Sequence, residues 1–167
     1  LENGMPKNAD DINVMYPASS ARAKEDKNWL ETAQKVTVEL QSGNPEYNQI
    51  YNTFAPMSLE QISKILKRLN ILPFDENKGE RLVAEYVPNV QKILDEKNLV
   101  VRDDGADIIP VKLDSDTAPM PPVLWRSSTG AQTYAAADLA AIYYRTTTDK
   151  PDDIVYFTDN RQKLHFT

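Results

Sequence analysis

Two side chains four residues apart, Tyr134 and Asp138, are the strongest candidates for a binding site in this sequence. In a helix, this spacing places the phenol and the carboxylate on one face, with their Cβ atoms roughly 5–6 Å apart. Of the natural cations, the guanidinium group fits such a pair best, because it is planar, always charged, and presents a fork of donors that one carboxylate accepts bidentately. The pair therefore predicts a site for an arginine ligand.

The same pair also has an ordinary structural interpretation. A tyrosine on a helix that packs on a sheet commonly extends its hydroxyl to the surface, and an aspartate in the first turns is commonly solvated. The neighbouring alanines suit both interpretations, because small side chains favour helix and let a ligand or a strand approach the backbone closely. These alanines are Ala135, Ala136, Ala137, Ala140 and Ala141.

Gln162 and His165 are further candidates near the end of the sequence. A side-chain amide both donates and accepts, so Gln162 suits the orientation of a polar ligand beside a charged pair. Taken alone, however, a loop glutamine is more often solvated. His165 is the single histidine, and a histidine in such a place is commonly half-buried with one satisfied nitrogen. One histidine implies no metal site, and the acidic pairs at 103–104 and 152–153 are predicted to be turn and cap residues.

Composition indicates an ordinary globular protein that does not bind phosphates tightly. The 167 residues are 41% hydrophobic and 26% charged, long enough for one domain with a sizeable core. A net charge of −6 and a pI near 4.8 lack the basic surface expected of a nucleic-acid-binding protein. The absence of cysteine excludes disulfides and thiolate metal sites and is compatible with a reducing cytoplasm. No apolar run approaches the roughly 18 residues of a membrane span.

The elements that must position the candidate residues are helical up to about residue 98. One apolar stripe is followed by Gly43, which favours a helix end there. Asn44 and Pro45 predict the start of a second helix, which Pro56 is expected to close. A capping box at Ser58 and Gln61 predicts a third helix, and a fourth is expected from Pro88. The first stripe consists of Trp29, Leu30, Ala33, Val36, Thr37 and Leu40.

Beyond residue 98 the pattern becomes that of strands. Residues 99–102 and 106–111 read as two strands joined by a turn at 103–105, because Asp-Gly accepts the positive φ that tight hairpin turns need. The proline-rich segment 114–122 is predicted to be a loop, and 123–126 a further strand. Thr133 is expected to cap a helix that carries Tyr134 and Asp138 and runs to about Arg145.

The last predicted element is a central strand at 153–158. Residues 159–162 would then form the loop at its carboxyl end, where open α/β sheets bind ligands. This arrangement would bring Gln162 to the ligand-binding edge of the sheet.

Many of these segments resemble, in order, the catalytic domain of arginyl-tRNA synthetase, a class I enzyme. The resemblance covers roughly residues 10–167. Its segments are Ser20-Ala-Arg-Ala-Lys, Glu39-Leu-Gln-Ser-Gly43, Glu46-Tyr47, Arg68-Leu-Asn-Ile71, Gly79-Glu80, Asp103-Asp-Gly-Ala106, Trp125-Arg126-Ser127, Gly130, Thr133 to Ala141, Asp153-Ile-Val-Tyr156 and Asp159 to Phe166.

The resemblance implies an α/β fold that is part of a Rossmann-like class I catalytic domain. The portion 1–98 would be the helical part of an insertion region, and 99–167 a strand-rich part with a small mixed sheet, together forming one compact unit. In this family, Tyr134 and Asp138 correspond to residues that hold the guanidinium of arginine, and Gln162 to a glutamine that lines the pocket. His165 corresponds to a residue near the nucleotide side.

The implied reaction is the joining of arginine to tRNA(Arg) in cytoplasmic protein biosynthesis, with ATP and its Mg²⁺. No side chain in this chain is assigned a catalytic role. Two ATP-handling signatures of class I enzymes, of the His-Ile-Gly-His and Lys-Met-Ser-Lys-Ser types, do not occur in the sequence. We therefore expect an internal piece of a longer ligase that is inactive alone, retains no ATP or Mg²⁺ and does not bind tRNA tightly. The alternative is a non-catalytic binding or scaffold module derived from a synthetase.

Two departures from the family pattern concern turn geometry and leave the substrate pair intact. Many members have Ser-Asp-Gly where this sequence has residues 127–130. A Thr or Arg is common just before the helix aspartate, where Ala136 and Ala137 stand.

Overall fold

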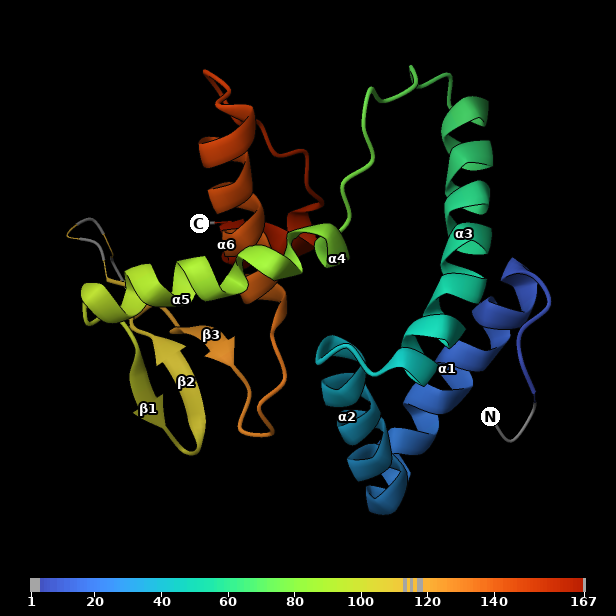
Figure 1. The fold of residues 1–167 in the computed structure, drawn as a ribbon, viewed down its shortest axis with the longest axis horizontal. Coiled ribbons are helices and arrows are strands. Elements are labelled where there is room, and N and C mark those ends of the chain that lie inside the picture. The colour runs from blue at the N-terminus through green and yellow to red at the C-terminus, as the bar shows by residue number, and fades with distance from the viewer. Residues whose placement is uncertain (1–3, 113, 115, 117–118, 167) are drawn as a thin grey trace. The chain divides into compact units, whose positions relative to one another are not determined.

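The chain forms two compact units, one up to Glu76 and one from Asn77 onward. The structure, a computed structural model, describes residues 4–112, 114, 116 and 119–166. The helices after Asn77 pack against the helix and sheet that follow them and so belong to the second unit. Figure 1 shows the elements of each unit.

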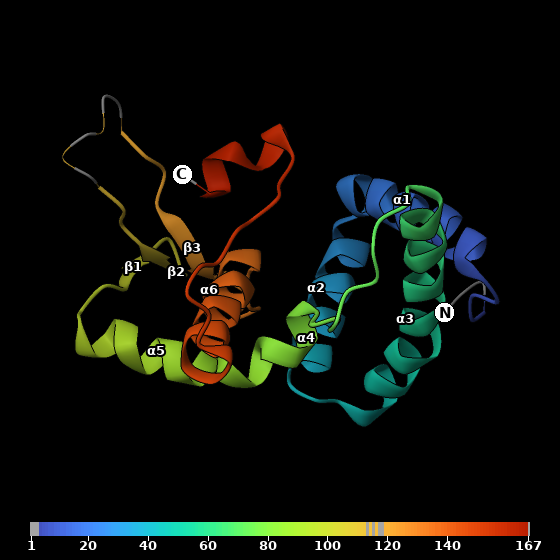
Figure 2. The ribbon, with the colours of Figure 1, turned by 90° about the horizontal axis from the view of Figure 1, so that it is seen from above.

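The first unit consists of three helices, which Figure 2 shows side by side. They are α1 (Ala9–Glu25), α2 (Lys27–Gln41) and α3 (Pro45–Arg68). The Asn8 side chain caps α1 by accepting a hydrogen bond from Asp11 N, and Asp26 caps α2 by accepting one from Trp29 N at 3.0 Å. The start of α1, which Asn8 caps, was not predicted from the sequence.

The predicted junction at Gly43 and Asn44, which lies between α2 and α3, is confirmed. Gly43 has φ +90°, the left-handed conformation in which glycine favours a helix end. The Asn44 side chain accepts from Glu46 N and Tyr47 N, and Pro45 occupies the first turn, where its missing N–H costs nothing.

The prediction that Pro56 ends this helix is wrong. Helix α3 runs through Pro56 to Arg68, so the apparent capping box at Ser58 lies inside a continuous helix. A proline removes one helical hydrogen bond, here to the carbonyl of Asn52. Both Asn52 and Pro56 are exposed, so water can hydrate this carbonyl and the helix continues.

The second unit is a small sheet with helices packed against it. Its helical segments and strands are α4 (Glu80–Val83), a 3₁₀ turn η1 (Ala84–Tyr86), α5 (Val87–Glu96), β1 (Val101–Asp103), β2 (Ala106–Ile109), β3 (Val123–Arg126), α6 (Tyr134–Tyr144), a π-helical turn η2 (Arg145–Asp149) and a 3₁₀ turn η3 (Asn160–Phe166). The predicted α5, the β1–β2 hairpin, β3 and α6 are confirmed. In the hairpin turn, Asp104 has φ 42° and Gly105 φ 79°.

The hydrophobic core described by the structure lies in this unit. Trp125 of β3 is its largest fully buried side chain, and Trp125 Nε1 donates to Gln91 Oε1 of α5 at 2.5 Å. Helix α6 joins the core through Ala136 and Ala140, which are 1% and 0% exposed. The core residues are Val83, Val87, Val90, Leu94, Ile109, Trp125, Ala136 and Ala140.

The predicted central strand at 153–158 is absent from the structure. The described sheet has three antiparallel strands in the order β1-β2-β3, so it is antiparallel and not mixed. Val155 is 71% exposed and Phe157 96% exposed. Apolar, β-prone residues form a strand only beside a partner strand, and residues 153–158 pair with none of the described strands.

Two further expectations concern the proline-rich loop and the absence of a membrane span. Of the predicted loop 114–122, residues 115, 117 and 118 lie outside the described residues, and the others belong to no helix or strand. None of the helices that the structure describes is long and apolar enough to cross a membrane.

Candidate functional site

The start of α6 is fixed to β3 by Thr133, the predicted cap. Thr133 Oγ1 accepts from Ala136 N at 3.3 Å and donates to the carbonyl oxygen of Leu124 at 2.5 Å. The preceding turn closes through Gly130, whose N–H donates to Ser127 O at 2.9 Å with φ +86°. The first turn of α6 is therefore anchored where Tyr134 begins.

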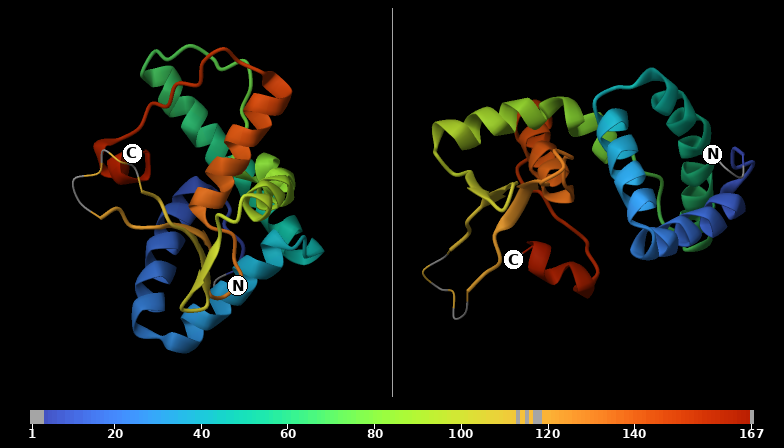
Figure 3. Two further views of the ribbon diagram at one scale, coloured as in Figure 1. Left: turned by 90° about the vertical axis from the view of Figure 1, so that its left-hand side faces the viewer. Right: turned by 90° about the horizontal axis from the view of Figure 1, so that it is seen from below.

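The four candidate residues come together in the second unit. Gln162 Nε2 donates to the Tyr134 hydroxyl at 3.1 Å, and His165 Nε2 lies 2.6 Å from Asp138 Oδ2. The rings of Tyr134 and His165 are 4.3 Å apart at their centroids. Figure 3 shows the chain after α6 turning back so that η3 returns toward this helix. Residues far apart in the sequence thus share one site on the surface of α6.

Gln162 reaches this site from a 3₁₀ turn and not from the carboxyl end of a central strand, as the sequence analysis expected. Asp159 caps the turn: its Oδ1 accepts from Arg161 N at 2.9 Å and from Arg161 Nε at 2.8 Å. The Arg161 side chain and then its backbone N–H hold the pKa of Asp159 below its ordinary value. The turn is therefore stabilised by local hydrogen bonds instead of a strand pairing.

The segment between α6 and η3 is attached through Tyr156. Arg145 Nη1 donates to the Tyr156 hydroxyl at 2.7 Å, and the Tyr156 ring lies 5.1 Å from the ring of Phe166. Phe166 in turn meets the His165 ring edge-on at 4.8 Å. These contacts lead from the end of α6 to the imidazole that touches Asp138.

The environment of Tyr134 keeps its phenol protonated. Desolvation raises the pKa of Tyr134, and the negative charges of Asp138 and Glu80 raise it further, whereas the hydrogen bond from Gln162 acts in the opposite direction. A neutral phenol presents both a donor and an acceptor to a ligand. The effect of Glu80, at the start of α4, on the pKa of Tyr134 could not be predicted from the sequence, because only the tertiary fold brings α4 near α6.

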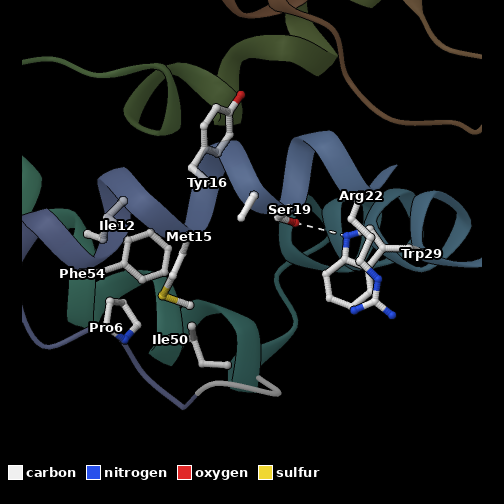
Figure 4. A pocket seen from close by; sticks show the side chains of 10 residues that line it. Pro6, Ile12, Met15, Tyr16, Ser19, Arg22, Trp29, Ile50 and Phe54 are labelled. Atoms are coloured by element: carbon white, nitrogen blue, oxygen red, sulfur yellow. Dashed lines mark hydrogen bonds between the residues drawn. The ribbon is translucent and has the colours of Figure 1, made fainter. Parts of the chain in front are cut away.

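A separate apolar cavity of about 480 Å³ lies in the first unit, and sequence reasoning also missed it. Figure 4 shows Trp29, Phe54 and Met15 around it, with the Arg22 guanidinium 3.9 Å above the Trp29 ring. The Trp29 indole donates to Ser19 Oγ at 3.2 Å at the same end. All its lining residues belong to α1, α2, α3 and the segment before them, so this cavity is not part of the Tyr134 site.

Comparisons with known proteins identify the family. Residues 2–167 match the family model of the class I tRNA synthetase (R) catalytic domain. The arginine–tRNA ligase of Hyphomonas neptunium is 36% identical over 163 residues, which are 96% of this chain and 28% of that ligase. The arginine–tRNA ligase of Agathobacter rectalis is 32% identical over 161 residues, 96% of this chain and 27% of the ligase.

A solved structure supports the fold. The crystal structure of arginyl-tRNA synthetase from Plasmodium falciparum superposes with a TM-score of 0.64 at 23% identity, covering 84% of this chain and 24% of that one. The chain spans about a quarter of the length of the curated relatives that it matches. Since the family model matches nearly every residue, the chain belongs to the family of class I tRNA synthetase catalytic domains of the arginine type.

Proposed function

We propose that this chain is the arginine-binding part of an arginine–tRNA ligase. The observation that carries the proposal is the convergence of Tyr134, Asp138 and Gln162 on one surface of α6, with Gln162 Nε2 3.1 Å from the Tyr134 hydroxyl. The relatives named above are arginine–tRNA ligases, and their activity supports the same substrate. The cytoplasm, where protein biosynthesis takes place, is the proposed location.

The proposed role of the three side chains is to bind and orient arginine. Asp138 accepts two parallel hydrogen bonds from the guanidinium, the Tyr134 ring lies against its planar face, and Gln162 orients the phenol and the ligand. None of the three is a nucleophile. Their contribution to the rate is to place the carboxylate of arginine correctly, which lowers the entropic cost of the reaction.

In the proposed ligase reaction, an oxygen of the arginine carboxylate attacks the α-phosphate of ATP. Arginyl adenylate forms and pyrophosphate leaves; a terminal ribose hydroxyl of tRNA(Arg) then takes the arginyl group and AMP leaves. Stabilisation of phosphate charge is the task of the ATP signatures, which this sequence does not contain. The described residues include no group of three or more His, Asp or Glu side chains that could hold a metal ion.

The first test is calorimetric titration of the chain with L-arginine, citrulline and lysine. We expect weak, saturable binding of arginine, weaker binding of lysine, and no binding of citrulline. A neutral urea leaves the Asp138 carboxylate with mismatched hydrogen bonds and an uncompensated desolvation cost, and lysine lacks the bidentate fork. Equal heats for arginine and citrulline would contradict a site built around the Asp138 charge.

The second test concerns the division of labour within the ligase. The chain alone is expected to show no aminoacylation of tRNA(Arg) with ATP and arginine, because it contains neither ATP signature and carries a net charge of −6, which repels tRNA. The assay measures acid-precipitable radioactive arginine, with a complete arginine–tRNA ligase as the positive control. Aminoacylation above the background without enzyme would disprove this expectation.

A further inference from the structure

The proposed arginine site is filled by the chain's own side chains. The turn η3, which we call the strap (Asn160–Phe166), covers the candidate face of α6. It places the Gln162 amide on the Tyr134 hydroxyl and the His165 imidazole on the Asp138 carboxylate. The two groups proposed to receive arginine therefore both have partners from one segment.

His165 occupies the two positions that a guanidinium would need. Its Nε2 is 2.6 Å from Asp138 Oδ2, and since a carboxylate accepts hydrogen bonds, Nε2 is the donor. Its ring lies 4.3 Å from the Tyr134 ring at an interplanar angle of 40°. A planar guanidinium that binds Asp138 bidentately and lies against Tyr134 would occupy the space of this imidazole.

We propose that the strap is a built-in closure of the arginine site, in which His165 imitates the guanidinium of the ligand and must leave Asp138 before arginine binds. The inference rests on the proposed function. It assigns to His165 the role of an internal competitor. It assigns to Gln162, whose amide donates to the Tyr134 hydroxyl, the role of a group that binds the ligand once the His165 end of the strap has moved.

The connection of the strap to α6 permits this movement. Residues 150–159 form no helix or strand, and Lys150 turns the chain with φ 50°. Every residue of the strap is exposed, Leu164 to 61%. A segment with few buried apolar contacts and no sheet hydrogen bonds opens at a low cost in free energy. The ring contact between Phe166 and Tyr156 opens together with His165.

Removal of His165 is expected to tighten arginine binding. When only the open fraction of a protein binds, the apparent Kd is the intrinsic Kd divided by this fraction. A strap that is closed roughly nine-tenths of the time would weaken binding about tenfold. In calorimetric titration, we therefore expect His165→Ala to lower the Kd for L-arginine by about threefold to tenfold. The matched control is Leu164→Ala, which truncates an exposed neighbour in the strap and should leave the Kd unchanged.

A second measurement uses the fact that His165 is the only histidine, so its imidazole ring protons give unique NMR signals. These signals should differ between the unmodified chain and the Asp138→Asn variant. On saturation with L-arginine, the signals of the unmodified chain should move toward those of the variant, because arginine replaces His165 at Asp138.

The outcomes separate this inference from the proposed function. If arginine binds but His165→Ala binds it no more tightly, or the ring signals do not move, the closure is overturned and the arginine site stands. If neither the unmodified chain nor His165→Ala binds arginine, the proposed site is overturned in this chain. Closure of an arginine site is then overturned as well, and the ring signals report only whether His165 contacts Asp138.

Discussion

Replacement of Asp138 by asparagine is expected to raise the KM for arginine by about 10- to 100-fold in a complete ligase that carries this segment. Hydrogen bonds to a charged group contribute about 1.5–3 kcal/mol, and about 1.4 kcal/mol corresponds to a factor of ten in affinity. Asparagine keeps the size of Asp138 but removes its charge and directs an NH₂ group toward the guanidinium donors. The KM should rise more than kcat falls, since Asp138 lies away from the reacting carboxylate.

The measurement is steady-state kinetics of aminoacylation with arginine as the varied substrate. Asp152→Asn is the matched control, because it makes the same chemical change at an exposed position. The control should leave the KM unchanged. An unchanged KM in Asp138→Asn would count against the assignment of this residue to the guanidinium.

Replacement of Trp125 by alanine is expected to lower the free energy of unfolding of the second unit by about 3–5 kcal/mol. The Trp125 side chain is 1% exposed and lies in the core formed by β3, α5 and α6. Its removal leaves a cavity, and it also deprives Gln91 Oε1 of the indole donor at 2.5 Å. A loss of this size is a large fraction of the stability of an ordinary domain.

Urea unfolding followed by circular dichroism measures this effect. Trp29→Ala, in the first unit, is the control, because Trp29 is only half-buried and lies under the exposed Arg22. We expect a clearly smaller loss from this change. Each unit contains one of the two tryptophans. In each variant, the fluorescence of the tryptophan that remains therefore reports the unfolding of the unit that was not changed. Equal losses from the two substitutions would contradict the central packing role of Trp125.

Local signals in the sequence predicted local structure well. The cap at Thr133, the junction at Gly43 and Asn44, and the hairpin turn at Asp104 and Gly105 were predicted and are present. Each depends on hydrogen bonds or backbone angles within a few residues, so a short stretch of sequence contains all the information.

Predictions that depended on distant neighbours were less successful. Pro56 does not end α3, because its exposed position leaves the freed carbonyl accessible to water. Residues 153–158 do not form a strand, because β-prone residues need a partner strand and the described sheet ends at β3.

The sequence by itself determined the pair at the centre of the site, because the four-residue spacing of Tyr134 and Asp138 places both on one face of α6 whatever surrounds the helix. It also named Gln162 and His165, but it predicted neither their contacts with each member of the pair nor Glu80 as a neighbour. Only the tertiary structure decided that the chain turns back after α6, which sets Gln162 on Tyr134 and His165 on Asp138. The physical reason is that these contacts join residues 27 and 28 positions apart, and such contacts depend on the path of the whole intervening chain and not on any local preference.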